Sequence, residues 1–354
     1  MQRIFLTHTV SKDMVLRYKL SMAACNFSHN LIDGGIFDKV YFVLPTFVRG
    51  KVKKFDGLVY SSLREHIILS RLAPVMENIR LFRQIPCRAS IWYYNCNILN
   101  VPLIILLKLF KPSVKQQMII LDYTPSNRPM ERFFLWLINH MDGTIRLADS
   151  PLFTVRNSVC LPGIVPANSL QYPLVTTVKK EFLISGALGD NIAMLPLLLD
   201  VFSQLPDFTL HITGKASDID LIEKYTGKYS NIVYHGMVSY EEYLCILHEI
   251  PFLLSTRNPA CLENQCNFPS KIIEALLHNR IVVSTLHYDQ LEGIRYLEVP
   301  SDKKGLKMNL QKIVAMPQSQ LLSYANQAEE VKVRFSCEIW RKNIIDIEKT
   351  TRNQ

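Results

Sequence analysis

Lys271 and Glu274 are the residues of this sequence best suited to bind a charged small molecule. Pro269 and Ser270 stand directly before them, and both residue types favour a first helical turn, proline through its fixed φ and serine through a hydroxyl that can cap backbone N–H groups. A helix N-terminus binds phosphate well, and Lys271 would add a full positive charge there. Glu274, one turn further on, can accept hydrogen bonds from two vicinal hydroxyls, as a ribose offers. The pattern indicates a site for a nucleotide diphosphate.

The segment from Asn267 to Thr285 contains the elements that would position these side chains. Four aliphatic residues at helical spacing predict a helix: Ile272, Ile273, Leu276 and Leu277. Asn279 would end this helix, because asparagine is the commonest substitute for glycine where the backbone turns left-handed. The run from Ile281 to Thr285 predicts a short buried strand. This order of elements places the helix N-terminus at the carboxyl edge of a parallel sheet.

This segment closely resembles the donor-site segment of glycosyltransferase family 4 (group 1), which contains retaining enzymes of bacterial polysaccharide and lipopolysaccharide pathways. The family segment reads like PSKxxEyxaxGkPVv, and Pro269, Ser270, Lys271 and Glu274 match it position by position. The resemblance implies that Glu274 binds the donor ribose. It also implies the GT-B fold, with two Rossmann-like parallel-sheet domains and an interdomain cleft. The likeness extends more weakly over the C-terminal half and only in outline over the N-terminal half.

Around the donor, the resemblance assigns further residues but also shows departures from the family. Family members carry a glycine and then an arginine and a lysine that grip the pyrophosphate, whereas this chain has Gly186 followed by Gly189, Asp190 and Asn191. Because these two cations are missing, Lys271 would have to bind the pyrophosphate, with Arg257 as a second candidate. Cys266 replaces the first glutamate of the family signature. Asn267 could meet sugar hydroxyls, although the ordinary polarity of a loop would explain it equally well.

In the N-terminal half, Asp122 and His8 are the candidates for work on the acceptor. Asp122 follows an apolar strand where the family often carries a His-Asp pair, and Leu121 occupies the histidine position. Asp122 would orient the acceptor or act as a base, or it would simply cap the turn at Pro125. His8 follows the first predicted strand and would face the cleft, although a lone histidine at a strand end is more often structural.

Catalysis would not need a metal ion or a cofactor. Lys271 and the helix behind it can stabilise a departing diphosphate, which suits a retaining transfer in which the leaving phosphate takes the acceptor proton. Asp218 and Asp220 form an Asp-x-Asp pair, which binds metal in the other large glycosyltransferase fold. Here they open a predicted helix, where acidic residues cap the N-terminus and complement its dipole.

The length of 354 residues suits two domains rather than one core. With 48% hydrophobic and 20% charged residues the composition is that of a globular protein. Predicted strands and helices alternate, so we expect an α/β fold with parallel sheets. The expected domains are an acceptor-side domain at 1–175 and a nucleotide-sugar donor domain at 176–334. A closing helix at 335–354 resembles the family's last helix, which commonly crosses back over the first domain.

Three stretches give less regular patterns. A helical pattern from about Leu58 to Phe82 is expected to break at Pro74. A turn is expected from Gly186 to Asn191, directly after a strand. The C-terminal helices are expected from about Ser319 onward.

The excess of positive over negative charge lies entirely in the N-terminal half. The chain has a net charge of +9, and residues 1–175 hold 21 Lys and Arg against 10 Asp and Glu. Such a domain suits an anionic membrane surface, a phosphorylated acceptor or nucleic acid, and of these three we do not expect nucleic acid as a partner. The densest basic cluster is Arg49, Lys51, Lys53 and Lys54, which a solvated loop explains equally well. The apolar helix expected at Asn97–Phe110 could lie on a bilayer, but such helices more often cover a sheet.

The expected location is the cytoplasm, peripheral at the inner membrane face. Eight cysteines without paired CxxC spacing do not suggest a disulfide framework, and no signal peptide or membrane span is predicted. The leading hypothesis is a glycosyltransferase that moves a sugar from a nucleotide-diphosphate donor to a glycan or lipid-linked acceptor. A nucleotide-sugar epimerase would need paired carboxylates that the loop at Glu263 does not clearly supply. A non-catalytic nucleotide-sugar-binding or partner subunit would explain the missing glutamate and cations.

Overall fold

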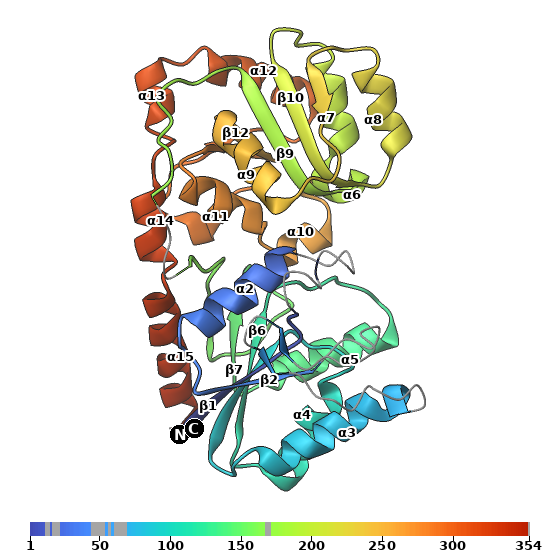
Figure 1. Cartoon of the computed structure of the whole chain (residues 1–354), viewed down its shortest axis with the longest axis vertical. Helices are drawn as coiled ribbons and strands as arrows, with labels where there is room; N and C mark the ends of the chain where they lie inside the picture. Colours follow the sequence, from blue (N-terminus) through green and yellow to red (C-terminus); the bar gives the residue numbers. More distant parts are fainter. Residues whose placement is uncertain are drawn as a thin grey trace. The chain divides into compact units, whose positions relative to one another are not determined.

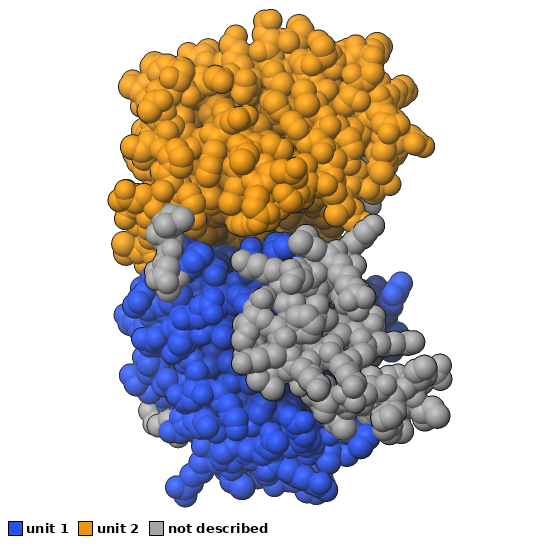
Figure 2. All heavy atoms as spheres, in the orientation of Figure 1, with its two compact units in different colours: residues 1–167, 335–354 blue, residues 168–334 orange. Residues whose placement is uncertain are grey.

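The structure is a computed structural model that describes residues 1–10, 15, 22–43, 54–55, 58–59, 69–166 and 171–352. The chain forms two compact units, residues 1–167 with 335–354, and residues 168–334 (Figure 1). Figure 2 colours the two units separately. Each unit contains one six-stranded sheet, and every pair of neighbouring strands in these sheets is parallel. The expected α/β class with two parallel-sheet domains is therefore confirmed.

Unit 1 is built on a sheet with the strand order β2-β1-β5-β6-β7-β8. Its strands are β1 (Gln2–Thr7), β2 (Lys39–Phe42), β5 (Ala89–Tyr94), β6 (Lys115–Ile120), β7 (Gly143–Arg146) and β8 (Ser158–Cys160), beside a hairpin of β3 (Lys54–Phe55) and β4 (Leu58–Val59). Its helices are α2 (Met22–Asp33), α3 (Leu69–Gln84), α4 (Val101–Phe110), α5 (Pro129–Asn139) and α15 (Cys337–Arg352). Helices α2 and α15 cover one face, while α3, α4 and α5 cover the other.

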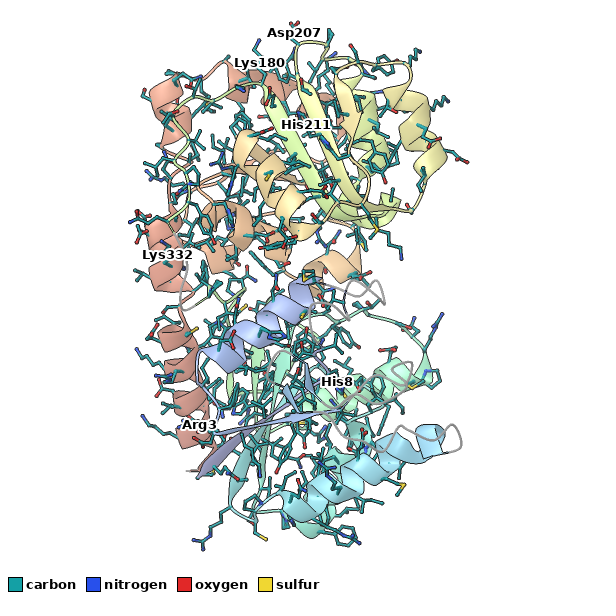
Figure 3. All side chains as sticks on the ribbon, in the orientation of Figure 1. Arg3, His8, Lys180, Asp207, His211 and Lys332 are labelled. Atoms are coloured by element: carbon teal, nitrogen blue, oxygen red, sulfur yellow. The ribbon has the colours of Figure 1, made fainter. Side chains whose placement is uncertain are left out.

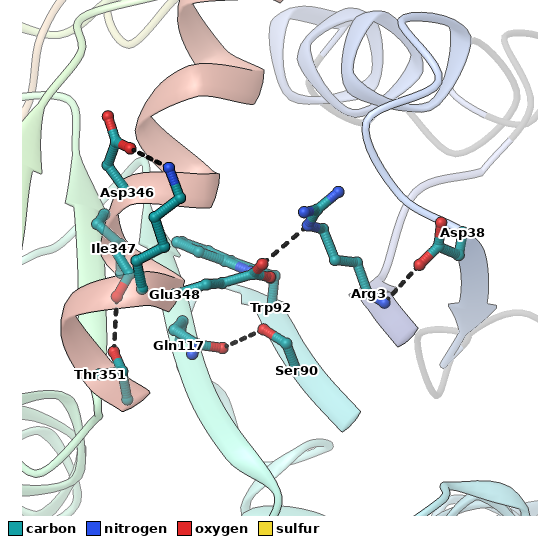
Figure 4. Close-up of polar contacts among 10 residues, drawn as sticks. Arg3, Asp38, Ser90, Trp92, Gln117, Asp346, Ile347, Glu348 and Thr351 are labelled. Carbon is teal, nitrogen blue, oxygen red and sulfur yellow. Dashed lines mark hydrogen bonds and ion pairs between the residues drawn. The ribbon is translucent and has the colours of Figure 1, made fainter. Parts of the chain in front are cut away.

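The last helix, α15, is fixed to the sheet of unit 1 by polar contacts from its buried face (Figure 4). The Glu348 carboxylate accepts hydrogen bonds from Arg3 Nε at 2.8 Å and from Trp92 Nε1 at 3.3 Å. Trp340 Nε1 donates to the carbonyl oxygen of Gly163 at 2.8 Å. Because Arg3 lies in β1, the first strand and the last helix of the chain stabilise each other.

Unit 2 is built on a sheet with the strand order β11-β10-β9-β12-β13-β14. Its strands are β9 (Glu181–Leu188), β10 (Thr209–Ala216), β11 (Ile232–Tyr234), β12 (Phe252–Ser255), β13 (Ile281–Ser284) and β14 (Leu297–Glu298). Its helices are α6 (Asp190–Ala193), α7 (Leu195–Phe202), α8 (Ile219–Thr226), α9 (Tyr240–Glu249), α10 (Leu262–Cys266), α11 (Ser270–Leu277), the 3₁₀ helix η1 (Asp289–Leu291), α12 (Lys303–Val314), α13 (Gln318–Leu322) and α14 (Ala328–Arg334). Stacked rings of Phe182, Phe208 and Phe252 lie in its core.

The boundary between the units differs from the one predicted near Val175. The units divide after Ala167, because the chain beyond Tyr172 is already tied to unit 2. The Val175 side chain is buried in the core of unit 2, and its N–H donates to Asn326 Oδ1 at 2.9 Å. Val178 is buried in the same core. Because the residues around Val175 and Val178 are polar, the sequence did not show that these two valines are buried.

Several local predictions need correction. The helical pattern from Leu58 to Phe82 starts wrongly, because Leu58 lies in β4, and Pro74 does not break it, because α3 runs from Leu69 to Gln84. A proline in the second turn of a helix removes one backbone hydrogen bond without ending the helix. The expected turn after Gly186 is strand up to Leu188. A further helix, α12, precedes the predicted start near Ser319. Three cations of the basic cluster, Arg49, Lys51 and Lys53, lie outside the described residues.

Within the described part of the chain, we find no helix whose length and apolarity would suit a membrane crossing.

Candidate functional site

The strand order of unit 2 contains a topological switch point between β9 and β12. From β9 the chain adds β10 and β11 on one side, and later β12, β13 and β14 on the other. Ligands of open α/β sheets bind beyond the carboxyl ends of the strands at such a point. The pairing register opens this position, because β12 pairs with β9 only at Phe252–Phe182 and Leu253–Leu183, whereas β10 pairs along β9 as far as Leu188. On the β12 side, the carboxyl end of β9 therefore has no strand partner among the described residues.

Helix α11 presents its N-terminus at this same edge, because it connects the parallel strands β12 and β13. The helix begins as predicted, but Pro269 is the N-cap residue and Ser270 is the first helical residue. The predicted capping role of Ser270 is wrong, since no described side chain caps the helix and Ser270 is exposed. The Ser270 hydroxyl can instead meet a ligand beside the first N–H groups of the helix. Asn279 ends the helix in the predicted left-handed conformation, with φ of 65°.

The Glu274 carboxylate lies one turn into α11 and is held by three hydrogen-bond donors. Tyr240 OH donates to Oε1 at 2.9 Å, and Tyr243 OH donates to Oε2 at 3.0 Å. Lys271 Nζ lies 2.8 Å from Oε2 and forms an ion pair with it. The side chain is 19% exposed, so the carboxylate is neither free in solvent nor sealed among apolar groups.

These contacts keep Glu274 ionised. Burial by itself would raise the pKa of this carboxyl, but the charge of Lys271 and the hydrogen bonds from Lys271, Tyr240 and Tyr243 outweigh it, so the pKa lies below its ordinary value. Burial, followed by the nearby charge of Glu274, raises the pKa of Tyr240 and Tyr243, so both phenols remain protonated donors. The cluster is therefore an anion surrounded by fixed donors at neutral pH.

Lys271 is less free to meet an external anion than the sequence indicated. Its ammonium group is paired with Glu274 and lies 3.8 Å from the ring centroid of Tyr243. Its side chain is 30% exposed, so the pair is accessible from solvent. A positive charge in the first turn of α11 is thus explained in part by its own carboxylate three residues on. A diphosphate would have to compete for it or share it.

Sequence reasoning missed the two tyrosines. They belong to α9, whose start is fixed by a capping box in which Ser239 and Glu242 exchange hydrogen bonds. Tyr240 and Tyr243 are three residues apart and therefore share one face of α9. The sequence could have shown that the two tyrosines share a face. The residues around them do not indicate that this face meets a carboxylate more than thirty residues later in the chain.

Gly186 and Gly214 create a close approach of two backbones at the switch-point edge. They are paired in register in β9 and β10, with φ of 110° and 127°. A Cβ on Gly214 would lie 2.1 Å from the Gly186 carbonyl oxygen, so only glycine fits there. Around Gly186 itself the space is open, because no described atom beyond its chain neighbours lies within 4 Å of the position that a Cβ would take. The candidate Gly186 therefore offers accessible backbone beside the place where a ligand would lie.

Arg257 and Asn267 also lie in the segment that follows β12. Arg257 exchanges backbone hydrogen bonds with the Thr285 hydroxyl at 2.7 Å, which ties the ends of β12 and β13 together. Its guanidinium Nη1 donates to Asn264 Oδ1 at 3.0 Å, so part of its donor capacity is used within the loop. Asn267 is buried at the C-terminal end of α10, where the sequence predicts a loop. Arg257 thus helps to fix the segment between β12 and α11, and Asn267 is buried within it.

In unit 1, the two acceptor-side candidates differ in environment. His8 directly follows β1 (Figure 3), and its Nδ1 lies 2.8 Å from the Val43 carbonyl oxygen. Burial lowers the pKa of His8 to about 4, so the imidazole is neutral at neutral pH, with Nδ1–H donated to Val43. Its Nε2 is enclosed and has no hydrogen-bond partner among the described residues. Asp122 is exposed and follows the carboxyl end of β6.

The Asp-x-Asp pair has the structural role predicted for it. Asp218 is the N-cap of α8, and its Oδ1 accepts a hydrogen bond from Leu221 N at 2.9 Å. Asp220 lies in the first turn of the same helix, where it complements the dipole. The side chains of this pair are thus accounted for by the helix they open.

No family model matches the chain, and a search of curated proteins found no match. Solved structures do match over the whole length. A structure described as trehalose-6-phosphate from E. coli bound with UDP-2-fluoro glucose has a TM-score of 0.67 at 10% identity, covering 98% of this chain and 99% of that chain. An α,α-trehalose 6-phosphate synthase from Burkholderia multivorans has a TM-score of 0.67 at 11% identity, covering 99% and 97%. AviGT4, a glycosyltransferase of avilamycin A biosynthesis, has a TM-score of 0.63 at 12% identity, covering 100% and 99%.

These matches define the class of fold. The chain has the GT-B architecture, in which two parallel α/β sheets occur in one chain, as the strand orders of both units show independently. At such low identity the likeness is one of fold. Function must therefore be argued from the residues of the site.

Proposed function

We propose that this chain is a retaining glycosyltransferase that moves a sugar from a nucleotide-diphosphate donor to a glycan or lipid-linked acceptor in surface polysaccharide biosynthesis. The proposal is supported by the fold it shares with AviGT4, which is named as a glycosyltransferase, and with a protein bound with UDP-2-fluoro glucose. The single observation that carries it is the ionised Glu274 carboxylate, fixed beside the N-terminus of α11 at the switch-point edge.

Each candidate residue has a distinct role in this proposal. Glu274 accepts hydrogen bonds from the ribose hydroxyls of the donor, and the α11 N-terminus binds the diphosphate together with Ser270 and Lys271. Arg257, Asn267 and the open backbone at Gly186 complete the donor side. These groups stabilise the negative charge that develops on the leaving diphosphate. Such electrostatic stabilisation is usually the largest single contribution to catalysis.

The transfer itself needs little from the acceptor side. The acceptor hydroxyl attacks the anomeric carbon on the face from which the diphosphate leaves. The new C–O bond forms as the bond to the phosphate oxygen breaks, and the hydroxyl proton passes to the departing phosphate. In this scheme Asp122 orients the acceptor, and neutral His8 would accept a hydrogen bond from an acceptor hydroxyl once Nε2, which is enclosed in this structure, becomes accessible.

The test compares Glu274→Gln and Glu274→Ala with the parent protein on UDP-, GDP- and ADP-sugars, with and without a lipid-linked acceptor. We expect slow donor hydrolysis or transfer by the parent. Removing a charged partner of two hydroxyls should weaken donor binding by roughly tenfold to a hundredfold. Glu329→Gln is the matched control, because Glu329 and Lys332 form another ion pair three residues apart, on α14. Equal donor affinity in the Glu274 and Glu329 variants would overturn the proposal.

One observation favours a second candidate, a non-catalytic nucleotide-sugar-binding or partner subunit. Both oxygens of Glu274 already have partners within the chain, and the segment from Gly186 to Asn191 contains no arginine or lysine. A binding subunit would keep the donor site without activating the leaving group. Saturable binding of a nucleotide sugar, with no hydrolysis and no transfer to any acceptor in the panel, would support this candidate over the enzyme.

A further inference from the structure

Helix α4 of unit 1 is apolar on both of its faces. Its inner face packs on the sheet through Val101, Leu103, Ile104 and Leu107, which are all buried. Its outer face carries Ile105 and Leu109, which are exposed, and Leu106, which is half-buried, and Leu109 is 68% exposed. A surface helix that covers a sheet normally has a polar outer face, and one that is apolar all round normally has a second apolar neighbour. The expectation that this helix covers the sheet thus accounts for only one of its faces.

Helix α5 also carries a stripe of exposed apolar side chains. Met130, Phe133 and Trp136 lie on its outer face, and Trp136 is 53% exposed. The rings of Phe133 and Trp136 stack with centroids 6.0 Å apart, and Trp136 contacts the His140 ring with centroids 4.3 Å apart. Large aromatic side chains rarely gather at the surface of a protein without a partner.

The two stripes belong to one surface. Lys108 Nζ, on the last turn of α4, donates to the carbonyl oxygen of His140 at the C-terminal end of α5, at 2.6 Å. Leu109 is adjacent to Lys108 in sequence, and the Trp136 ring contacts the His140 ring, so the contact joins the exposed parts of both helices. We call these six outward residues the α4–α5 surface: Ile105, Leu106, Leu109, Met130, Phe133 and Trp136.

The charges around the α4–α5 surface are mainly positive. Helix α4 contains no carboxylate, and α5 contains one, Glu131, with Arg132 beside it. Lys108 and Arg132 are both exposed at the surface itself. The wider half of the chain that contains both helices has 21 Lys and Arg against 10 Asp and Glu over residues 1–175. Long cationic side chains can extend from an apolar layer toward anionic groups above it.

We propose that the α4–α5 surface docks on an anionic lipid bilayer, with its leucine and aromatic side chains inserted at the interface and Lys108 and Arg132 among the headgroups. Tryptophan and phenylalanine are the residues that favour the interface, and lysine and arginine near the surface add affinity for anionic lipid. A protein partner would also cover apolar area, but the positive field favours a surface of phosphates. This docking is independent of the glycosyl transfer proposed above, because it involves none of the donor-site residues.

Trp136 gives a direct readout. The chain has three tryptophans, and the other two, Trp92 and Trp340, are fully buried. Collisional quenching by iodide therefore reports almost entirely on Trp136. Vesicles of phosphatidylcholine with about 30 mol % phosphatidylglycerol should protect it from iodide and shift its emission to shorter wavelength, whereas pure phosphatidylcholine should do so much less. The full chain is used, and binding is measured in parallel by vesicle sedimentation.

Two variants test the two parts of the interaction. Leu109→Ser combined with Phe133→Ser should lower the partition onto anionic vesicles by roughly tenfold or more, because two inserted apolar side chains are lost. Arg132→Glu should lower it several-fold on anionic vesicles only. Met237→Ser combined with Val333→Ser is the control, because these exposed apolar residues lie in unit 2. All variants should keep the parent's circular dichroism and donor hydrolysis.

The proposal is overturned if Trp136 stays equally accessible to iodide in the presence of anionic vesicles. It is also overturned if the Leu109 and Phe133 double variant partitions like the control. Self-association that protects Trp136 without lipid, and that the same double variant abolishes in analytical ultracentrifugation, would assign the surface to a protein interface instead.

Discussion

The Glu274 carboxylate already has three hydrogen-bond donors within the chain, although the sequence indicated Glu274 only as a binding residue. An ionised carboxylate can accept about four hydrogen bonds. Tyr240, Tyr243 and Lys271 already supply three donors, so a ribose with two hydroxyls cannot simply be added. If Lys271 turns toward the donor's diphosphate, it releases one lone-pair position for the second hydroxyl. The tyrosines would then orient the carboxylate while the lysine exchanges one anion for another.

Tyr243→Phe and Tyr240→Phe test this division of labour. Each variant removes one donor to an ionised carboxylate, so the pKa of Glu274 should rise and the protein should lose about 1–2 kcal/mol of unfolding free energy. Urea denaturation at neutral pH measures the loss. Nucleotide-sugar titration should show weaker binding in both variants, with the deficit growing as the pH is lowered toward the raised pKa.

Tyr225→Phe is the control for that prediction. The Tyr225 hydroxyl donates to Asp200 Oδ1 at 2.6 Å, so this is another phenol that holds a carboxylate in unit 2. Its removal should lower stability without changing donor binding. If all three phenylalanine variants bind the donor equally well, the tyrosines of α9 have no part in the site.

At the scale of elements, sequence reasoning succeeded where a local pattern and the fold agreed. Helix α11 and strand β13 were predictable because four buried aliphatic residues, a proline start and Asn279 all indicate the same unit. Strand existence was also predictable through most of the chain, since buried strands of parallel sheets are short continuous apolar runs. The Asp218 cap followed from its position after a strand.

The misses have physical causes that a local pattern does not contain. Helix α12 was overlooked because lysines and Gly305 obscure a stripe of Leu306, Leu310 and Ile313, although Asp302 caps it and the stripe was readable. The partners of Glu274 could not be predicted, because they depend on the packing of α9 against α11. Tertiary contacts decide such side-chain environments, and sequence spacing does not reveal them.

The end of α11 gives a prediction at this scale. Asn279 is buried in a left-handed conformation, and its Nδ2 donates to the Tyr172 carbonyl oxygen at 3.0 Å. Asn279→Gly keeps the conformation but loses the side-chain contacts, and should cost about 1–3 kcal/mol of unfolding free energy. Asn279→Ala also strains the backbone, and should cost about 1 kcal/mol more. Urea denaturation of both variants separates the two effects.

The order of the Asn279 variants is the critical result. If alanine is tolerated as well as glycine, the left-handed turn is not what makes asparagine necessary there. Asn326→Gly and Asn326→Ala form a matched pair, because Asn326 also has a positive φ, of 55°, and a side chain bonded to the backbone of Val175.

Unit 1 is discontinuous in sequence, because it consists of residues 1–167 and 335–354. Residues 335–354 return to it after unit 2 is complete, and Glu348 then binds Arg3 and Trp92. The sheet of unit 1 is therefore covered on one face by a helix that follows unit 2 in the sequence. The charge is distributed unequally as well, with the positive excess in the N-terminal half that also carries the α4–α5 surface.

Both units contain a histidine whose burial makes the folded chain sensitive to acid. Burial lowers the pKa of His8 to about 4. Burial, followed by the neighbouring His248, lowers the pKa of His278 to about 4, and its Nδ1 lies 2.6 Å from His248 Nε2. The unfolded chain binds protons on these residues near its ordinary value of 6.5, before the folded chain does. The unfolding free energy should therefore fall as pH decreases from about 6.5 to about 4, and level off for these groups below that.

Each histidine should contribute roughly 1–2 kcal/mol to the loss between about pH 7 and pH 5, since a pKa unit corresponds to about 1.4 kcal/mol. Glu274 acts in the same direction but at lower pH, because its depressed pKa makes it lose stabilisation only as it is protonated. Urea denaturation across this range should show the decline, and His8→Gln and His278→Gln should each reduce its slope. His287→Gln, at an exposed position where Glu298 raises the pKa, should leave the acid decline in place. An unfolding free energy that stays level down to pH 5 would show that neither imidazole is held neutral by the fold.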